Sequence, residues 1–202
     1  MVENLGKVYV TVVSGLPRSG TSMMMQMLAA GGVSVLTDGA RAPDPDNPRG
    51  YFEFEPVKRT ARDAGWLADA AGKAVKLAHV LLPDLPRGYE YRVLFMHRDM
   101  RETLASQETM LRRLGRRGAN LDSRQLAEVF ASQIRRVREW VAGQAHFATL
   151  DVNYQQVIDD RAGQAARVNR FLDGRLDEAK AAGVVEPALY RQRVGGGGGG
   201  GP

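Results

Sequence analysis

Apolar residues along the chain fall into short continuous runs that alternate with longer segments of helical spacing. A short run rich in β-branched and aromatic residues predicts a buried strand, and apolar residues three or four positions apart predict one face of a helix. The predicted strands span residues 7–14, 74–78, 91–96 and 147–152, and the predicted helices span residues 20–30, 56–71, 98–113, 122–143, 162–172 and 175–182. Strands that alternate with helices in this way indicate an α/β domain with a central, mostly parallel sheet flanked by helices in three layers.

The connections between these elements carry cap and loop signals. Gly31 and Gly32 follow the first predicted helix and indicate a left-handed C-terminal cap. Residues 37–50 combine prolines, aspartates and glycines, which disfavour helix and strand alike. This segment is therefore predicted to be a long loop of the kind that carries function.

Composition fits a single globular domain followed by a tail. The 202 residues are 44% hydrophobic and 25% charged, which excludes a disordered or fibrous chain for most of the length. Seven of the 23 glycines form the uninterrupted run 195–201. We therefore expect one domain over residues 1–194 and a flexible glycine-rich tail over residues 195–202.

Residue types that are missing narrow the chemistry. The chain has no cysteine, which excludes disulfides, thiolate metal sites and cysteine nucleophiles.

No stretch approaches the ~20 apolar residues that span a bilayer, and the first residues lack the layout of a signal peptide. We therefore expect a cytoplasmic protein without a membrane segment. The formal net charge of +5 indicates an anionic ligand or partner.

A glycine-containing turn joins the first predicted strand to the first predicted helix. Residues 15–22 have the glycine spacing of the nucleotide-binding loop GxxxxGK[ST], but Thr21 stands where the lysine is expected. Backbone N–H groups of such a turn converge on an anion, and Gly20 allows close approach. Arg18 can supply the missing positive charge, and the missing lysine argues against ATP or GTP hydrolysis. Hydroxyl groups that can donate to phosphate oxygens belong to Ser19, Thr21 and Ser22.

The five residues Pro17-Arg-Ser-Gly-Thr21 resemble the phosphosulfate loop, PRSGT or PKSGT, of sulfotransferases that use 3′-phosphoadenosine 5′-phosphosulfate (PAPS). The resemblance implies a three-layer P-loop fold. It also implies that Arg18 contacts the phosphosulfate and that Ser19, Gly20, Thr21 and Ser22 hold the 5′-phosphate.

A second segment supports the same resemblance. His97-Arg-Asp-Met-Arg-Glu-Thr-Leu-Ala-Ser106 follows a predicted strand and resembles the family segment R-D-P-x-[DE]-x-x-x-S, with Met100 in place of proline. In the family, the arginine and the serine hold the 3′-phosphate, which implies this role for Arg98 and Ser106. The arrangement is physically sound, because open α/β sheets bind ligands at the carboxyl ends of their strands. Ser106 would lie two helical turns further along, on the same face.

The general base is assigned by resemblance to one of two residues. Residues 47–53 resemble a glycine-aromatic-glutamate segment of bacterial sulfotransferase-like proteins, which implies that Glu53 is the base. His79 is the alternative, because Lys76-Leu-Ala-His79 resembles a lysine-threonine-histidine segment of cytosolic family members with an offset of one residue. Each residue also has a structural interpretation, Glu53 as a solvated carboxylate at a helix start and His79 as a partly buried histidine.

The sequence thus predicts transfer of a sulfuryl group from PAPS to a hydroxyl or amine of a small-molecule or carbohydrate acceptor. Neither a metal nor a nucleic-acid partner is expected, and residues 37–50 and 114–125 are expected to shape the acceptor site. One alternative is a nucleotide kinase or phosphotransferase that uses the same loop. Another is a non-catalytic protein that binds anions or nucleic acid through the basic residues 112–117.

Overall fold

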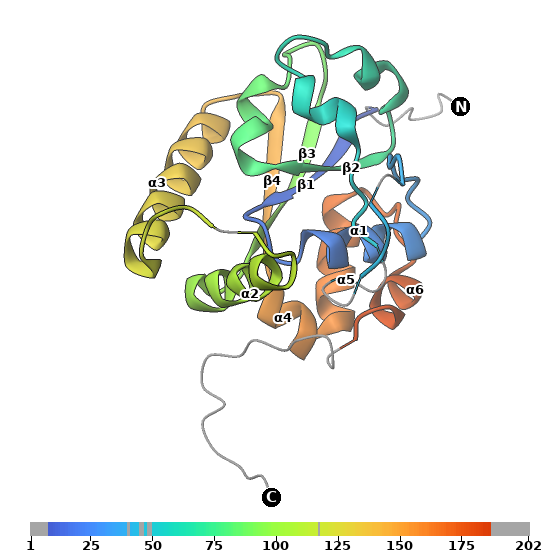
Figure 1. Ribbon diagram of the computed structural model, residues 1–202. Coiled ribbons are helices and arrows are strands. Elements are labelled where there is room, and N and C mark those ends of the chain that lie inside the picture. Colours follow the sequence, from blue (N-terminus) through green and yellow to red (C-terminus); the bar gives the residue numbers. More distant parts are fainter. Residues whose placement is uncertain (1–7, 40, 45–46, 48–49, 117, 187–202) are drawn as a thin grey trace, which may run out of the picture.

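A parallel sheet forms the centre of the structure (Figure 1). The computed structural model describes residues 8–39, 41–44, 47, 50–116 and 118–186, and within them the sheet has four strands in the order β2–β1–β3–β4. The strands are β1 (Val10–Gly15), β2 (Ala74–Ala78), β3 (Tyr91–His97) and β4 (Phe147–Asn153). Every neighbouring pair is parallel. The predicted α/β class is confirmed, while the predicted glycine tail lies outside the described residues.

Strands β1, β2 and β3 are largely buried on both faces because helices cover both. Along β1, Val12 and Val13 point to opposite faces and belong to two separate hydrophobic clusters. The same alternation separates Phe95 from Met96 on β3. The sheet is therefore the middle of three layers.

One outer layer consists of α-helices that pack on the face of Val13. They are α1 (Thr21–Ala30), α4 (Tyr154–Asp159), α5 (Arg161–Phe171) and α6 (Glu178–Gly183). The opposite layer contains three short 3₁₀ helices and one long helix, namely η1 (Glu55–Arg59), η2 (Gly65–Asp69), η3 (His79–Asp84) and α3 (Ser123–Ala142). Helix α2 (Met100–Arg113) follows β3 directly. No helix in the described part of the chain is long and apolar enough to cross a membrane.

Capping residues fix where the helices begin and end. The predicted left-handed cap of α1 is present, since Gly32 has a φ of 92° and the Val33 N–H donates to the Leu28 carbonyl at 2.9 Å. Asp99 caps α2 by accepting hydrogen bonds from the N–H groups of Arg101 and Glu102. The cap of α2 therefore lies directly beside Arg98.

The predicted single helix over residues 56–71 is wrong. The structure has η1 and η2 there, separated by a turn. Asp63 accepts a hydrogen bond from the Gly65 N–H at 3.0 Å, a local turn that competes with helix continuation. Trp66 then enters the core and donates its indole N–H to the Thr60 hydroxyl at 3.1 Å. Side-chain hydrogen bonds within the segment thus override its helix propensity.

Candidate functional site

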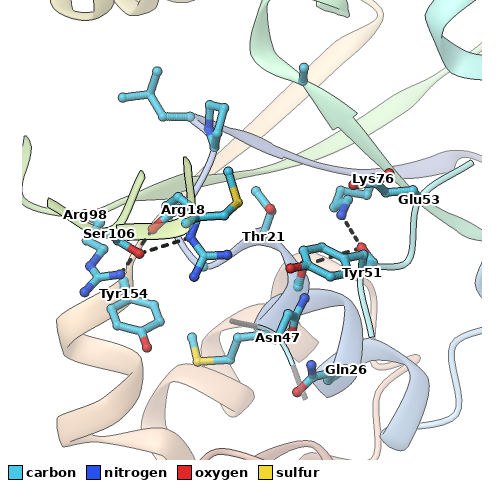
Figure 2. Close-up of a pocket in the computed structure, with 18 of the residues that line it drawn as sticks. Arg18, Thr21, Gln26, Asn47, Tyr51, Glu53, Lys76, Arg98, Ser106 and Tyr154 are labelled. Atoms are coloured by element: carbon cyan, nitrogen blue, oxygen red, sulfur yellow. Dashed lines mark hydrogen bonds between the residues drawn. The ribbon is translucent and has the colours of Figure 1, made fainter. Parts of the chain in front are cut away.

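A cavity of about 360 Å³ opens where the carboxyl ends of β1, β2 and β3 meet (Figure 2). Its wall includes Gly15 at the end of β1, Ala78 at the end of β2 and Arg98 just after β3. Further wall residues come from α1, from α2 and from the segment 41–53. This is the position at which open α/β sheets bind their ligands.

The turn between β1 and α1 forms one side of this cavity. Arg18 has a φ of 71°, a left-handed conformation that is uncommon for a residue other than glycine. Arg18, Gly20, Thr21 and Ser22 line the cavity, whereas Ser19 does not. The Ser19 side chain is buried and donates its hydroxyl to the Leu16 carbonyl at 2.7 Å. Ser19 therefore holds the turn together from the inside.

Gly20 is required by its backbone conformation and by its neighbour. It has a φ of 98°, and a Cβ atom at this position would lie 2.4 Å from Cδ2 of Tyr154. Tyr154 is buried and also lines the cavity. The turn and α4 are thus packed together without room for a side chain.

Gly20→Ala should therefore destabilise the protein more than a glycine-to-alanine change at a position where only the positive φ is unfavourable. Gly32→Ala is the matched control, because Gly32 has a φ of 92° and nothing lies within 4 Å of its added Cβ. We expect Gly20→Ala to lower the free energy of unfolding by about 1–3 kcal/mol more than Gly32→Ala. Urea unfolding of both variants measures this difference, and equal losses would show that the contact with Tyr154 is unimportant.

Three side chains from distant parts of the sequence meet beside this turn. Arg18 Nε donates to the Ser106 hydroxyl oxygen at 3.0 Å, and Arg98 Nη1 donates to the Arg18 carbonyl at 3.2 Å (Figure 2). Ser106 lies two turns into α2, and Arg98 lies between β3 and α2. The two segments singled out in the sequence are therefore joined by hydrogen bonds at one end of the cavity.

Arg98 is held from two further sides. Its Nε donates to Glu102 at 3.0 Å, and the two side chains are 9% and 5% exposed. Its guanidinium carbon lies 4.8 Å from the centre of the Tyr154 ring, within cation–π range. A guanidinium group fixed in this way is suited to donate two parallel hydrogen bonds to two oxygens of a phosphate.

The other end of the cavity contains Glu53. Its carboxylate lies 3.4 Å from a guanidinium nitrogen of Arg41, and Arg41 stacks over the Tyr51 ring at 3.3 Å. The Tyr51 hydroxyl donates to the Asp44 carboxylate at 2.7 Å. Burial, and after it this hydrogen bond, raises the pKa of Tyr51 to about 12. A network of paired charges thus fixes Glu53 on the cavity wall.

His79 takes a different position. Its side chain is buried, with 3% of its surface exposed, and it is not among the residues that line the cavity. Burial lowers the pKa of its imidazole, which favours the neutral form. Of the two residues considered for the base, the structure brings only Glu53 to the cavity wall.

Lys76 is a cavity residue to which the sequence analysis gave no role. It lies in β2, and its ammonium donates to the Tyr51 carbonyl oxygen (Figure 2). Burial, together with the positive charges of Arg41 and Arg18, lowers its pKa to about 8, although Glu53 acts in the opposite direction. The signal in the sequence is a lysine inside an otherwise apolar strand, a residue type that is rarely buried without a partner.

The lowered pKa of Lys76 predicts how stability depends on pH. Because the unfolded chain binds this proton more tightly than the folded chain, the stability that Lys76 contributes rises as the pH increases from about 8 to about 10.5. The free energy of unfolding of the wild type, relative to that of Lys76→Met, should therefore rise by up to about 3 kcal/mol between these two pH values. Urea unfolding at both ends of the interval measures the gain, and a constant difference would contradict the shifted pKa.

No protein-family model matches the chain, and no curated protein matches its sequence. Sulfotransferase STF1 from Mycobacterium tuberculosis H37Rv superposes with a TM-score of 0.54 at 17% identity, covering 93% of this chain and 74% of that one. The sulfotransferase domain from the curacin biosynthetic pathway superposes with a TM-score of 0.50 at 13% identity, covering 94% of this chain and 80% of that domain. A sugar kinase from Janibacter sp. HTCC2649 gives a TM-score of 0.48 at 14% identity, covering 86% of this chain and 98% of that one.

The two sulfotransferase structures match nearly the whole of this chain at low sequence identity. Identity at this level relates folds and leaves residue roles and substrates to the site itself. The resemblance to sulfotransferases, first visible in two short sequence segments, therefore extends to the fold of the chain.

Proposed function

We propose that the protein is a sulfotransferase that moves a sulfuryl group from PAPS to a hydroxyl or amine of a small-molecule or carbohydrate acceptor. The observation that carries the proposal is that two segments with arginine side chains, each suited to an anion, meet at one end of one cavity. The turn after β1 provides Arg18, and the segment after β3 provides Arg98 and Ser106. A nucleotide with phosphate groups at both ends of its ribose would engage both segments at once.

Each segment is proposed to hold one end of the donor. Arg18, Gly20, Thr21 and Ser22 bind the 5′-phosphosulfate, because Gly20 precedes the N-terminus of α1 and the exposed backbone N–H groups there attract an anion. Ser19 supports this turn through its bond to Leu16. Arg98 and Ser106 bind the 3′-phosphate, since Arg98 is already oriented by Glu102.

The remaining groups are proposed to handle the proton and the developing charge. An acceptor oxygen or nitrogen attacks sulfur, the bond between sulfur and the 5′-phosphate oxygen breaks, and adenosine 3′,5′-bisphosphate leaves. Glu53 takes the acceptor proton as general base. Arg18 stabilises the negative charge that develops on the departing phosphate oxygen, and Lys76 adds a second positive charge on the cavity wall.

Label transfer separates this proposal from a kinase. The protein is incubated with a panel of hydroxyl and amine acceptors and either [³⁵S]PAPS or [γ-³²P]ATP, with and without EDTA. Transfer of ³⁵S that persists in EDTA is the expected result. Transfer of ³²P from ATP that requires magnesium, without ³⁵S transfer, would replace the sulfotransferase with a kinase. Salt-dependent RNA or DNA binding without transfer of either label would instead indicate a non-catalytic protein.

A further inference from the structure

The two ends of the cavity differ in chemistry. Arg18, Arg98 and Ser106 gather at one end, and Lys76, Tyr51 and Glu53 lie towards the other (Figure 2). Two side-chain amides, from Gln26 and Asn47, also line the cavity and belong to neither group. The proposed function assigns no ligand group to these amides.

The amides of Gln26 and Asn47 have unused hydrogen-bonding capacity. Gln26 comes from α1, five residues after Thr21, and Asn47 comes from the segment that also carries Glu53. Both residues are half-buried, and among the described residues neither side-chain amide makes a hydrogen bond within the protein. Each amide offers two donor hydrogens and one acceptor oxygen. A ligand group that both donates and accepts, such as a hydroxyl, would use both functions.

The charges near Glu53 are paired, which disfavours a charged acceptor. Glu53 lies beside Arg41, and Asp44 accepts the Tyr51 hydroxyl and lies 3.6 Å from a second nitrogen of Arg41. The carboxylates of Glu53 and Asp44 are offset by the positive charges of Arg41 and Lys76 at the same end. Because these four charges balance, an acceptor that carries its own charge gains no net attraction, and this end of the cavity is suited to a neutral, polar molecule.

Near Glu53, a flat aromatic acceptor finds no open aromatic ring to stack on among the described residues. Tyr51 is the aromatic residue beside Glu53, but it is 5% exposed and the Arg41 guanidinium covers its ring at 3.3 Å. Leu16 and Leu77 line the wall with exposed fractions of 5% and 1%. Neither side chain offers the broad open face that a phenol ring would cover.

We infer that the acceptor is a neutral, hydroxyl-rich molecule, a sugar or another polyol, and that Gln26 and Asn47 select it by hydrogen bonds to its hydroxyl groups. The inference rests on the proposed function, because it takes the remaining part of the cavity to be the acceptor site. A ligand displaces the water molecules that are hydrogen-bonded to the amides. A ligand without matching hydroxyls would leave the amides without hydrogen bonds, so a site built from amides discriminates against it.

The test combines two acceptor classes with a matched pair of variants. Methyl hexopyranosides and glycerol represent polyols, and 4-nitrophenol and 2-naphthol represent planar phenols. Gln26→Met keeps the length of the side chain and removes its amide. Gln156→Met makes the same change at an exposed position of α4, outside the cavity. Initial rates of ³⁵S transfer give KM and kcat, and calorimetry gives the Kd of adenosine 3′,5′-bisphosphate.

Polyols are expected to be sulfated with a higher kcat/KM than phenols. Gln26→Met should raise KM for the preferred polyol by about three- to tenfold, the loss of one neutral hydrogen bond, and leave the nucleotide Kd unchanged. Asn47→Leu should act in the same direction, and Gln156→Met should have no effect. A preference for phenols, no polyol turnover in a protein that binds the nucleotide, or wild-type KM in both cavity variants would overturn the inference alone. Loss of nucleotide binding in the wild type would overturn the proposed function and the inference together.

Discussion

Arg98→Ala is expected to abolish the preference of the protein for nucleotides that carry a 3′-phosphate. Arg98 is held by the buried Glu102 and by the Arg18 carbonyl, so its guanidinium is fixed before a ligand arrives. Loss of its charge-assisted hydrogen bonds should weaken adenosine 3′,5′-bisphosphate about 10- to 100-fold. AMP lacks the 3′-phosphate and should bind almost as before. Calorimetric titration with both nucleotides gives the ratio of the two dissociation constants.

Two further variants keep this test interpretable. Arg98→Ala removes the guanidinium that pairs with the buried Glu102 carboxylate, which itself destabilises the fold. The double variant Arg98→Ala/Glu102→Ala removes that charge and should show the same loss of preference. Arg101→Ala, an exposed change on α2, should leave the ratio unchanged. Equal weakening of both nucleotides would remove Arg98 from the 3′-phosphate site.

Glu53→Gln is expected to lower kcat about 10²- to 10⁴-fold, the usual contribution of a general base. The glutamine keeps the shape of the side chain but is not basic enough to take the proton from the substrate hydroxyl or amine. Nucleotide affinity should change little, because Glu53 lies away from Arg98 and Ser106 (Figure 2). The effect should therefore be on turnover, measured as ³⁵S transfer at saturating donor.

Glu55→Gln is the matched control for this change. Glu55 lies two residues further along, its side chain is exposed, and it pairs with Lys58. It should retain wild-type turnover. Full activity in Glu53→Gln, combined with loss of activity in His79→Asn, would move the role of base to the buried histidine.

Much of the end of the cavity that carries Arg18 and Arg98 could be predicted from the sequence because its signals are local. The turn at residues 15–22 is specified by glycine spacing between a strand and a helix. Arg98 and Ser106 were identified by their resemblance to a family segment, and their positions at a strand end and two helical turns later agree with it. The hydrogen bonds that join these two segments connect residues 88 and 80 positions apart. The resemblance of both segments to sulfotransferase motifs implied that they bind phosphate, which stays a prediction, and the parallel sheet brings them together.

The opposite end of the cavity could not be predicted in the same way. Lys76 reaches the Tyr51 carbonyl only because β2 lies beside β1, and Arg41 stacks on Tyr51 across a loop without periodic structure. In the turn after β1, the inward position of Ser19 was equally unpredictable, because it depends on the hydrogen bond from its hydroxyl to the Leu16 carbonyl. These are contacts between side chains and backbone groups whose partners no sequence pattern identifies.

Calorimetric titration with adenosine 3′,5′-bisphosphate in EDTA tests the sulfotransferase assignment most directly, since it requires no acceptor. Binding at one site per chain is expected, at least about tenfold tighter than AMP because the 3′-phosphate adds charge-assisted hydrogen bonds. Magnesium should not change the dissociation constant. No saturable binding at high micromolar nucleotide, or binding of magnesium-ATP alone, would contradict the assignment.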